Sequence, residues 1–222
     1  MSHASPSSHA KIFSSAKAIS GATPPNVFQT VDLGSGKGTH MLGQAARHPN
    51  RRYAVVDKEY REGGFLYPLV PSLRNKGLSV CGSKIEEQLD MMVRSGTRAR
   101  NLNFEMPFPG MHEDTREVSM KAEEFRGVMS HVLSNAPHIL LPNGKIFLTT
   151  EQESFARIAE KDAKKSGFSV RRKPLPHPRQ TQKIGANARS FIAGFSLVRL
   201  EITFPLRKAF PAKKDRRAWP KV

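Results

Sequence analysis

The stretch FQTVDLGSGKGTHMLGQAARHPNRRYAVVDKEY, Phe28–Tyr60, decides the fold. The apolar run over 27–33, which includes Asp32, predicts a buried strand, and glycines at 34, 36 and 38 follow it directly. A helix is predicted over 37–48, and a second strand over 52–57 ends in Asp57. Glycines between a strand and a helix permit positive φ and let a ligand approach the bare backbone. The stretch therefore predicts a strand–helix–strand unit with a ligand at its turn.

The rest of the chain repeats this alternation of strands and helices. It predicts an α/β fold with a Rossmann-like, doubly wound and mostly parallel sheet. Residues 1–26 are predicted to be a flexible Ser/Ala-rich arm, 27–205 the single domain, and 206–222 a basic tail. Further strands are predicted at 78–81, 100–104 and 145–149, helices at 84–94, 117–134 and 151–166, a turn at 142–144, a loop at 171–187, and one or two closing strands, with an antiparallel arrangement as one option, within 190–204.

Charge is concentrated near the end of the chain. The 222 residues carry 36 Lys and Arg against 19 Asp and Glu, a net charge of +17. From Arg171 onward there are 14 basic and 2 acidic residues, an excess typical of a surface that binds a polyanion such as RNA. The residues expected to contact RNA phosphates are Arg171, Arg172, Lys173, Arg179 and Lys183.

Cysteine and histidine usage argues against disulfides and metal sites. Cys81 is the single cysteine of the sequence, which excludes an internal disulfide, and it is expected to be a small buried residue. His112, Glu113 and Asp114 are adjacent in a predicted loop and do not point at one ion, so no metal is predicted. No apolar run approaches the roughly 18 residues of a membrane span. A cytoplasmic monomer is expected, with organelle import as the lesser alternative.

Three classes of ligand compete for the glycine turn. A phosphate-binding P-loop requires glycine at position 31 and Ser or Thr at 38, where the chain has Val31 and Gly38. A dinucleotide fingerprint requires a third glycine at position 39, which is Thr39. The remaining candidate is an adenosine-containing ligand without a pyrophosphate, with Asp57 binding the ribose hydroxyls.

At this point the sequence resembles the class I S-adenosyl-L-methionine (SAM)-dependent methyltransferases. The resemblance implies SAM as the cofactor. It implies that the glycine turn lines the methionine and ribose portion, that Asp32 helps to hold the amino-acid moiety, that Asp57 binds the ribose, and that Ser83 lies at the adenine edge. The implied cofactor residues are Asp32, Gly34, Ser35, Gly36, Gly38, Asp57 and Ser83.

A second segment, Leu102–Gly110, resembles the tRNA (guanine-N7)-methyltransferases, whose motif reads Asn-Phe-Pro-Asp-Pro-Trp-Pro-Lys. Asn103, Phe104, Pro107 and Pro109 match that motif, and Phe108 replaces its tryptophan. The resemblance implies that Asn103 is a catalytic candidate, that Phe104 and Phe108 stack on the base, and that Thr150 and Glu151, which match a Thr-Asp pair of the family, belong to the RNA site. Glu105, where the motif has proline, is the second catalytic candidate.

The match departs from the family at Met106, which occupies the position of the motif's Asp. Either Glu105 or Asp114 takes over the role of that acid, or the base is a different one, or catalysis has been lost. The first hypothesis is a SAM-dependent RNA methyltransferase acting on tRNA or, as a second possibility, rRNA. The alternatives are a catalytically impaired protein that serves as an RNA-binding or ribosome-assembly scaffold, and a methyltransferase acting on a small molecule or a protein.

Overall fold

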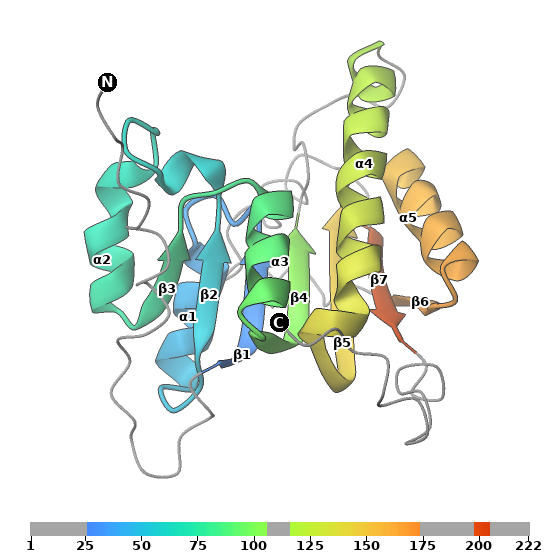
Figure 1. Ribbon diagram of the computed structural model, residues 1–222. Helices are drawn as coiled ribbons and strands as arrows, with labels where there is room; N and C mark the ends of the chain where they lie inside the picture. The colour runs from blue at the N-terminus through green and yellow to red at the C-terminus, as the bar shows by residue number, and fades with distance from the viewer. Residues whose placement is uncertain (1–25, 106–115, 174–197, 205–222) are drawn as a thin grey trace, which may run out of the picture.

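A computed structural model describes residues 26–105, 116–173 and 198–204 (Figure 1). Within these residues the strands form one seven-stranded sheet in the order β3-β2-β1-β4-β5-β7-β6. The strands are β1 Val27–Leu33, β2 Tyr53–Val56, β3 Leu78–Cys81, β4 Arg98–Glu105, β5 Leu140–Thr150, β6 Ser169–Lys173 and β7 Val198–Thr203.

The sheet is mostly parallel, as the alternation of strands and helices predicts. β1 lies between β2 and β4 and is parallel to both, and β3 and β5 extend the parallel arrangement on either side. β7 is inserted antiparallel between β5 and β6. The antiparallel option for the last strand is therefore confirmed, and the five central parallel strands share one carboxyl edge.

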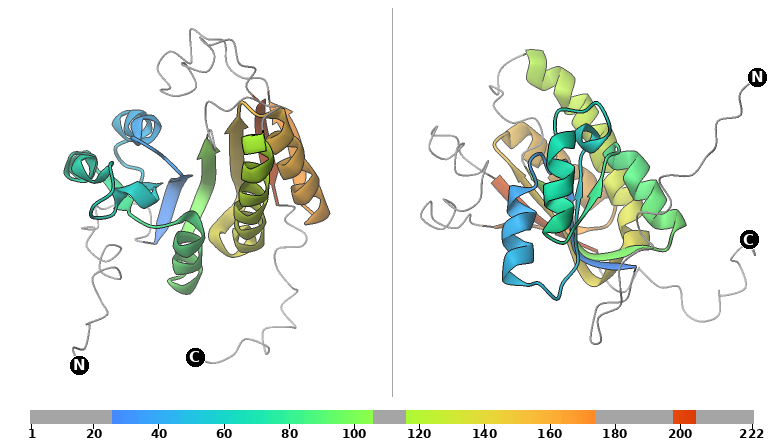
Figure 2. Two further views of the ribbon diagram at one scale, coloured as in Figure 1. Left: turned by 90° about the horizontal axis from the view of Figure 1, so that it is seen from above. Right: turned by 90° about the vertical axis from the view of Figure 1, so that its left-hand side faces the viewer.

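Helices cover both faces of the sheet, which confirms the doubly wound arrangement (Figure 2). On one face lie α1 Thr39–Arg47 and the short α2 Val70–Asn75. On the other face lie α3 Ile85–Arg94, α4 Arg116–Ile139 and α5 Glu153–Lys165. Two 3-10 turns, η2 Lys58–Tyr60 and η3 Tyr67–Leu69, connect β2 to α2. No described helix is both long and apolar enough to span a membrane.

The hydrophobic core has two parts of unequal size. The larger part lies between the sheet and α3, α4 and α5, and a smaller one lies beneath α1 and α2. At the centre of the larger part the ring of Phe125 stacks between Phe155, 4.8 Å away, and Phe104, 6.0 Å away. These three rings tie α4 to β4 and α5.

Several elements differ from the sequence predictions. α4 continues past Ser134 to Ile139, because Ala136 and Ile139 extend its buried stripe. The predicted turn at 142–144 lies inside β5, where Asn143 has φ 63° and the register between β4 and β5 shifts. The first residues of the predicted 171–187 loop belong to β6, which pairs with β7. α2 was not predicted; it is six residues long and contains a proline.

Replacing Phe125 tests the larger core. The Phe125→Ala protein is expected to lose about 3–5 kcal/mol of unfolding free energy in urea titrations, because a fully buried ring leaves a cavity. The control is Phe65→Ala, whose side chain is 75% exposed and whose loss is expected to stay within about 0.5 kcal/mol. Equal losses for the two variants would contradict this view of the core.

Candidate functional site

The predicted cofactor residues and the catalytic candidate Glu105 lie at the ends of four strands along the same edge of the sheet. The glycine turn follows β1, Asp57 follows β2, Gly82 and Ser83 follow β3, and Glu105 ends β4. The order of the strands reverses at β1, because the chain moves outward from β1 to β2 and β3 and then returns to β4. In open α/β sheets ligands bind at the carboxyl ends of the strands beside such a reversal.

The glycine turn has a conformation that side chains rarely adopt. Gly34, Gly36 and Gly38 have φ angles of 68°, 53° and 67°. A Cβ atom on the buried Gly38 would also lie only 3.1 Å from the Tyr60 hydroxyl oxygen. The backbone N–H groups of Gly34 and Ser35 both donate to the Val56 carbonyl oxygen, at 2.8 and 3.1 Å. The turn is therefore fixed against the end of β2.

The Asp57 carboxylate joins the turn to the segment after β2. Its Oδ2 accepts a hydrogen bond from the Gly36 N–H, and its Oδ1 accepts one from the Glu59 N–H, both at 3.0 Å. Tyr60 donates its hydroxyl to the Gly36 carbonyl oxygen from the same side. Because a carboxylate oxygen has two lone pairs, both oxygens of Asp57 keep one acceptor position for a ligand.

Asp32 is a buried carboxyl group at the end of β1. Its side chain is 3% exposed, and Oδ1 has no hydrogen-bond partner among the described residues. Burial, together with the negative charge of Glu105, raises the pKa of Asp32 to about 8. The group is therefore mostly protonated at neutral pH, and a cation beside it would favour its ionised form.

A histidine that the sequence analysis did not single out completes this cluster. His40 Nδ1 lies 2.9 Å from Glu105 Oε2, and both side chains are mostly buried. Burial disfavours the charged imidazole, but the contact with Glu105 and the charge of Asp32 outweigh it and raise the pKa of His40. His40 and Glu105 meet only because β1 and β4 are neighbours in the sheet, which no local sequence pattern indicates.

The end of β3 provides a close approach of two backbone segments. A Cβ atom on Gly82 would lie 2.6 Å from the backbone nitrogen of Arg61, so only glycine fits. The next residue, Ser83, donates its hydroxyl to Gln88 Oε1 at 3.1 Å. Cys81 is buried, as expected, and burial raises its thiol pKa to about 12.

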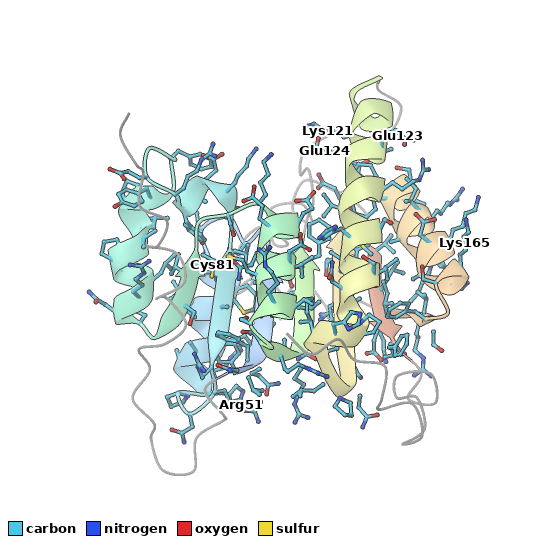
Figure 3. The ribbon with its side chains drawn as sticks, in the orientation of Figure 1. Arg51, Cys81, Lys121, Glu123, Glu124 and Lys165 are labelled. Carbon is cyan, nitrogen blue, oxygen red and sulfur yellow. The ribbon has the colours of Figure 1, made fainter. Side chains whose placement is uncertain are left out.

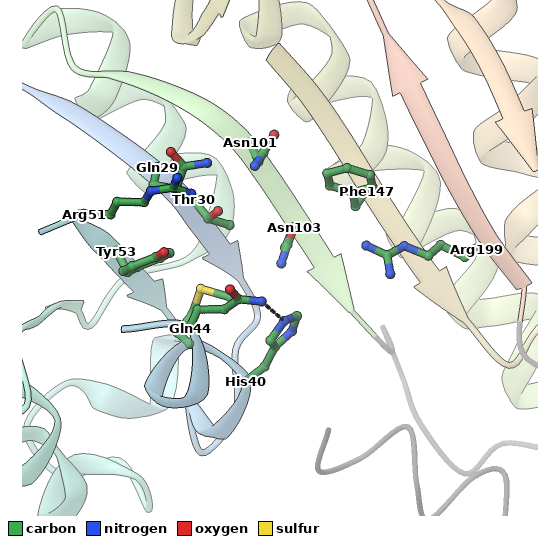
Figure 4. A pocket seen from close by; sticks show the side chains of 11 residues that line it. Gln29, Thr30, His40, Gln44, Arg51, Tyr53, Asn101, Asn103, Phe147 and Arg199 are labelled. Carbon is green, nitrogen blue, oxygen red and sulfur yellow. Dashed lines mark hydrogen bonds between the residues drawn. The ribbon is translucent and has the colours of Figure 1, made fainter. Parts of the chain in front are cut away.

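The alternation along β4 separates its candidate residues. Asn103 lines a cavity of about 140 Å³ on the face that carries α1 (Figure 4). Phe104 lies on the opposite face, where it is 5% exposed and packs against Phe125. The expectation that Phe104 stacks on a base is therefore corrected: its ring belongs to the core.

The remaining candidates for RNA binding are dispersed. Thr150 and Glu151 are buried at the end of β5, where Thr150 Oγ1 accepts from the Gln152 N–H at 3.0 Å. Arg172 contacts Glu153 and Glu160 on α5 at 2.9 and 3.2 Å, away from the cavity. The candidates Phe108, Arg179 and Lys183 lie outside the described residues, as does Met106. Arg171 and Lys173 share the sheet face of the cavity, as their register with β7 shows.

Two solved methyltransferases have a similar fold. The 16S rRNA methyltransferase KamB matches with a TM-score of 0.53 and 12% identity over 81% of this chain and 87% of its own. The 16S rRNA (adenine(1408)-N(1))-methyltransferase from Catenulisporales acidiphilia, solved with its cosubstrate SAM, matches with a TM-score of 0.52 and 18% identity over 89% and 91%. The protein thus has the class I methyltransferase fold. No protein-family model matches the chain, and no curated protein sequence matches it.

The raised pKa of Asp32 predicts how stability changes with pH. The folded protein holds this proton up to about pH 8, whereas the unfolded chain releases it near pH 3.8, so stability falls as pH rises through this window. The Asp32→Asn protein is expected to show a flatter profile in urea titrations and to gain at least about 1 kcal/mol over the wild type at pH 8.

His40 also contributes a fall with rising pH above its ordinary pKa of 6.5, and its contact with Glu105 is retained in the Asp32→Asn variant. Asp162→Asn, on α5, is the control, and its profile is expected to follow that of the wild type. Parallel curves for Asp32→Asn and the wild type would mean that Asp32 is ionised in the folded protein.

Proposed function

We propose that the protein is a SAM-dependent methyltransferase that acts on RNA. The observation that carries this proposal is the glycine turn bound to Asp57 and placed next to Asp32, at the strand edge of a methyltransferase fold. A buried acid with an unpartnered oxygen and a carboxylate with spare acceptor positions together suit a ligand with a cationic amino-acid end and a ribose.

Different residues of the chain would bind different parts of SAM. Asp32 would take the ammonium group, the turn from Gly34 to Gly38 would line the methionine portion, and Asp57 would accept from the ribose hydroxyls. Ser83, at the end of β3, would face the adenine. SAM, when bound, supplies an electrophilic methyl group.

RNA is proposed as the substrate because of charge. The excess of basic residues from Arg171 onward neutralises a polyanion, and Arg171 and Lys173 lie on the same sheet face as the cavity beside α1. The two structural neighbours above are named as 16S rRNA methyltransferases, which supports rRNA at least as much as tRNA.

The finer proposal is methylation of guanine N7, as the Asn103-Phe104 motif suggests. The N7 lone pair is available, so no proton has to be removed first, and the site has only to align the base with the methyl group. Asn103 offers an amide for the base edge, and Glu105, held by His40, offers an acceptor. This assignment accounts for activity without the acid that Met106 replaces.

One observation favours a second candidate function. Met106 occupies the position of the acid in the motif of the guanine-N7 enzymes, and a methionine side chain binds a guanine edge only weakly. A protein that binds RNA without transferring a methyl group, as a scaffold in RNA processing or ribosome assembly, would fit that substitution.

Methyl transfer from labelled SAM to RNA that lacks modifications tests the proposal. The wild type is expected to produce a methylated nucleoside by mass spectrometry, with 7-methylguanosine for the finer assignment. Asp57→Ala is expected to abolish transfer and to weaken SAM binding in calorimetry at least about tenfold, because charged hydrogen bonds contribute roughly 1.5–3 kcal/mol each.

Asp162→Ala removes a carboxylate from α5 and serves as the matched control, which is expected to bind SAM like the wild type. Thermal unfolding of each variant separates a loss of binding from a loss of fold. RNA binding without any transferred methyl group would favour the scaffold, and an Asp57→Ala protein with wild-type SAM affinity would refute the proposed cofactor site. Methyl transfer to a small molecule or protein at an affinity insensitive to salt would refute the RNA substrate.

A further inference from the structure

The two faces of the sheet differ sharply over β4, β5, β7 and β6. On the face of α3, α4 and α5, these strands bury Leu102, Ile146, Leu148, Leu200 and Ile202. On the other face, the described helices α1 and α2 cover only the half of the sheet around β1, β2 and β3 (Figure 2). We call the remaining half the open face; its residues in register are Asn101, Asn103, Lys145, Phe147, Arg171, Lys173, Arg199 and Glu201.

The polar character of the open face extends along whole strands rather than being confined to one site. β5 and β7 alternate strictly over Lys145–Leu148 and Arg199–Ile202, with every second residue apolar and buried. Such alternation is typical of strands with one buried and one solvated face. A packing helix would require an apolar surface, and Phe147 is the only apolar member of the open face among the residues that the structure describes.

Positive charge predominates on the open face. Lys145, Arg171, Lys173 and Arg199 face one carboxylate, that of Glu201, which lies 3.2 Å from Lys145 and 3.6 Å from Lys173. Glu105, at the end of β4, is engaged by His40. The surface therefore complements an anion.

Arg199 lies over the ring of Phe147 within this charged surface. The guanidinium of Arg199 lies 4.8 Å from the centroid of the Phe147 ring. Figure 4 shows both side chains across the cavity from His40 and Gln44 of α1, with Asn101 and Asn103 between them. Aromatic rings and arginine planes are the groups on which unpaired bases stack, and amides pair with base edges.

The size of the cavity indicates one group of a longer ligand. Its volume of about 140 Å³ is well below the roughly 300 Å³ at which small-molecule pockets begin. It also lies next to the proposed cofactor site, because Asn103, which lines it, is the register partner of Asp32 on β1. A ligand lying on the open face thus reaches the edge of the sheet where the methyl group is proposed to be transferred.

Two neighbouring segments of the chain do not complement this surface. Residues 174–197, between β6 and β7, contain three Lys and Arg and no acid, and residues 1–25 contain two lysines and no acid, whereas residues 106–115, after β4, contain the acids Glu113 and Asp114. Like charges on a segment and its docking surface disfavour contact. The charge and the Phe147–Arg199 pair together favour an external polyanion with exposed rings.

We propose that the open face binds unpaired RNA, with one base stacked on Phe147 and Arg199 and the phosphates contacting Lys145, Arg171 and Lys173. This inference rests on the proposed function for its biological meaning, since it describes how the RNA substrate is held beside the cofactor. It extends that proposal by stating which form of RNA binds and where.

The test measures the affinity of the full chain for a fluorescein-labelled single-stranded RNA of about 12 nucleotides, by anisotropy at several salt concentrations. Phe147→Ala is expected to weaken binding roughly tenfold, whereas Phe147→Tyr retains the ring and is expected to bind like the wild type. Arg199→Gln is expected to weaken binding, and Arg171→Gln, which removes a phosphate contact, is expected to reduce the slope of log affinity against log salt by about 0.7. A duplex of the same sequence is expected to bind less tightly, because its bases are already stacked.

Lys165→Gln is the matched control for charge, because Lys165 lies at the end of α5 in the opposite layer (Figure 3). It is expected to change neither the affinity nor the salt slope appreciably. Thermal unfolding accompanies each variant, and Phe147→Tyr guards against a loss of affinity that reflects misfolding.

Wild-type RNA affinity in both Phe147→Ala and Arg199→Gln would overturn the inference, as would a preference for duplex RNA. A rise in affinity on removal of residues 1–25, together with insensitivity to Phe147→Ala, would indicate that the chain's own first residues occupy the open face. Calorimetry with SAM on the same preparations separates the two proposals. A wild type that binds the oligonucleotide through Phe147 but does not bind SAM would refute the cofactor proposal alone.

Discussion

The hydrogen bonds from Gly36 and Glu59 to the Asp57 carboxylate hold together the edge on which the site is built. The glycine turn has three positive φ angles in five residues, a conformation that is costly unless its surroundings fix it. The Val56 carbonyl oxygen accepts hydrogen bonds from the same turn, and the Tyr60 hydroxyl donates one to it. As a result, the start of α1, the end of β1 and the segment after β2 form one rigid unit, and Asp32 and His40 are positioned by it.

The second constraint is the unequal cover of the sheet. α1 and α2 protect the strands that surround the proposed cofactor site, while α3, α4 and α5 bury the whole opposite face. One half of the first face therefore presents polar and basic side chains next to the carboxyl edge. In the proposed function this division places a cofactor at the carboxyl edge beside the covered half and the nucleic acid on the open half, with Asn103 at the boundary.

Local sequence patterns predicted much of the fold. β1 and β3 were predicted with their observed bounds, because buried strands flanked by glycine or polar residues have clear ends. β6 was not predicted because its run of basic residues has no alternation of apolar and polar side chains. Arg171 lies on the open face and Arg172 on the face of α5. Arg172 pairs with Glu153 and Glu160 of α5, a contact that depends on tertiary structure.

The site was predictable only in part for the same reason. The glycine turn and Asp57 belong to one local unit, and the structure places them in contact. Phe104 was misassigned because a motif does not show which face of β4 a side chain occupies. His40 and the Phe147–Arg199 pair depend on which strands are neighbours, and the position of β7 between β5 and β6 is a property of the topology.

Amide hydrogen exchange of the full chain with and without SAM tests whether the carboxyl edge of the sheet holds the cofactor. Slower exchange is expected in the presence of SAM over residues 34–40, 57–61 and 82–85, the three segments that follow β1, β2 and β3, with unchanged exchange in α5. Unchanged exchange in all three segments at saturating SAM, or protection confined to other parts of the sheet, would contradict the assignment of this edge as the cofactor site.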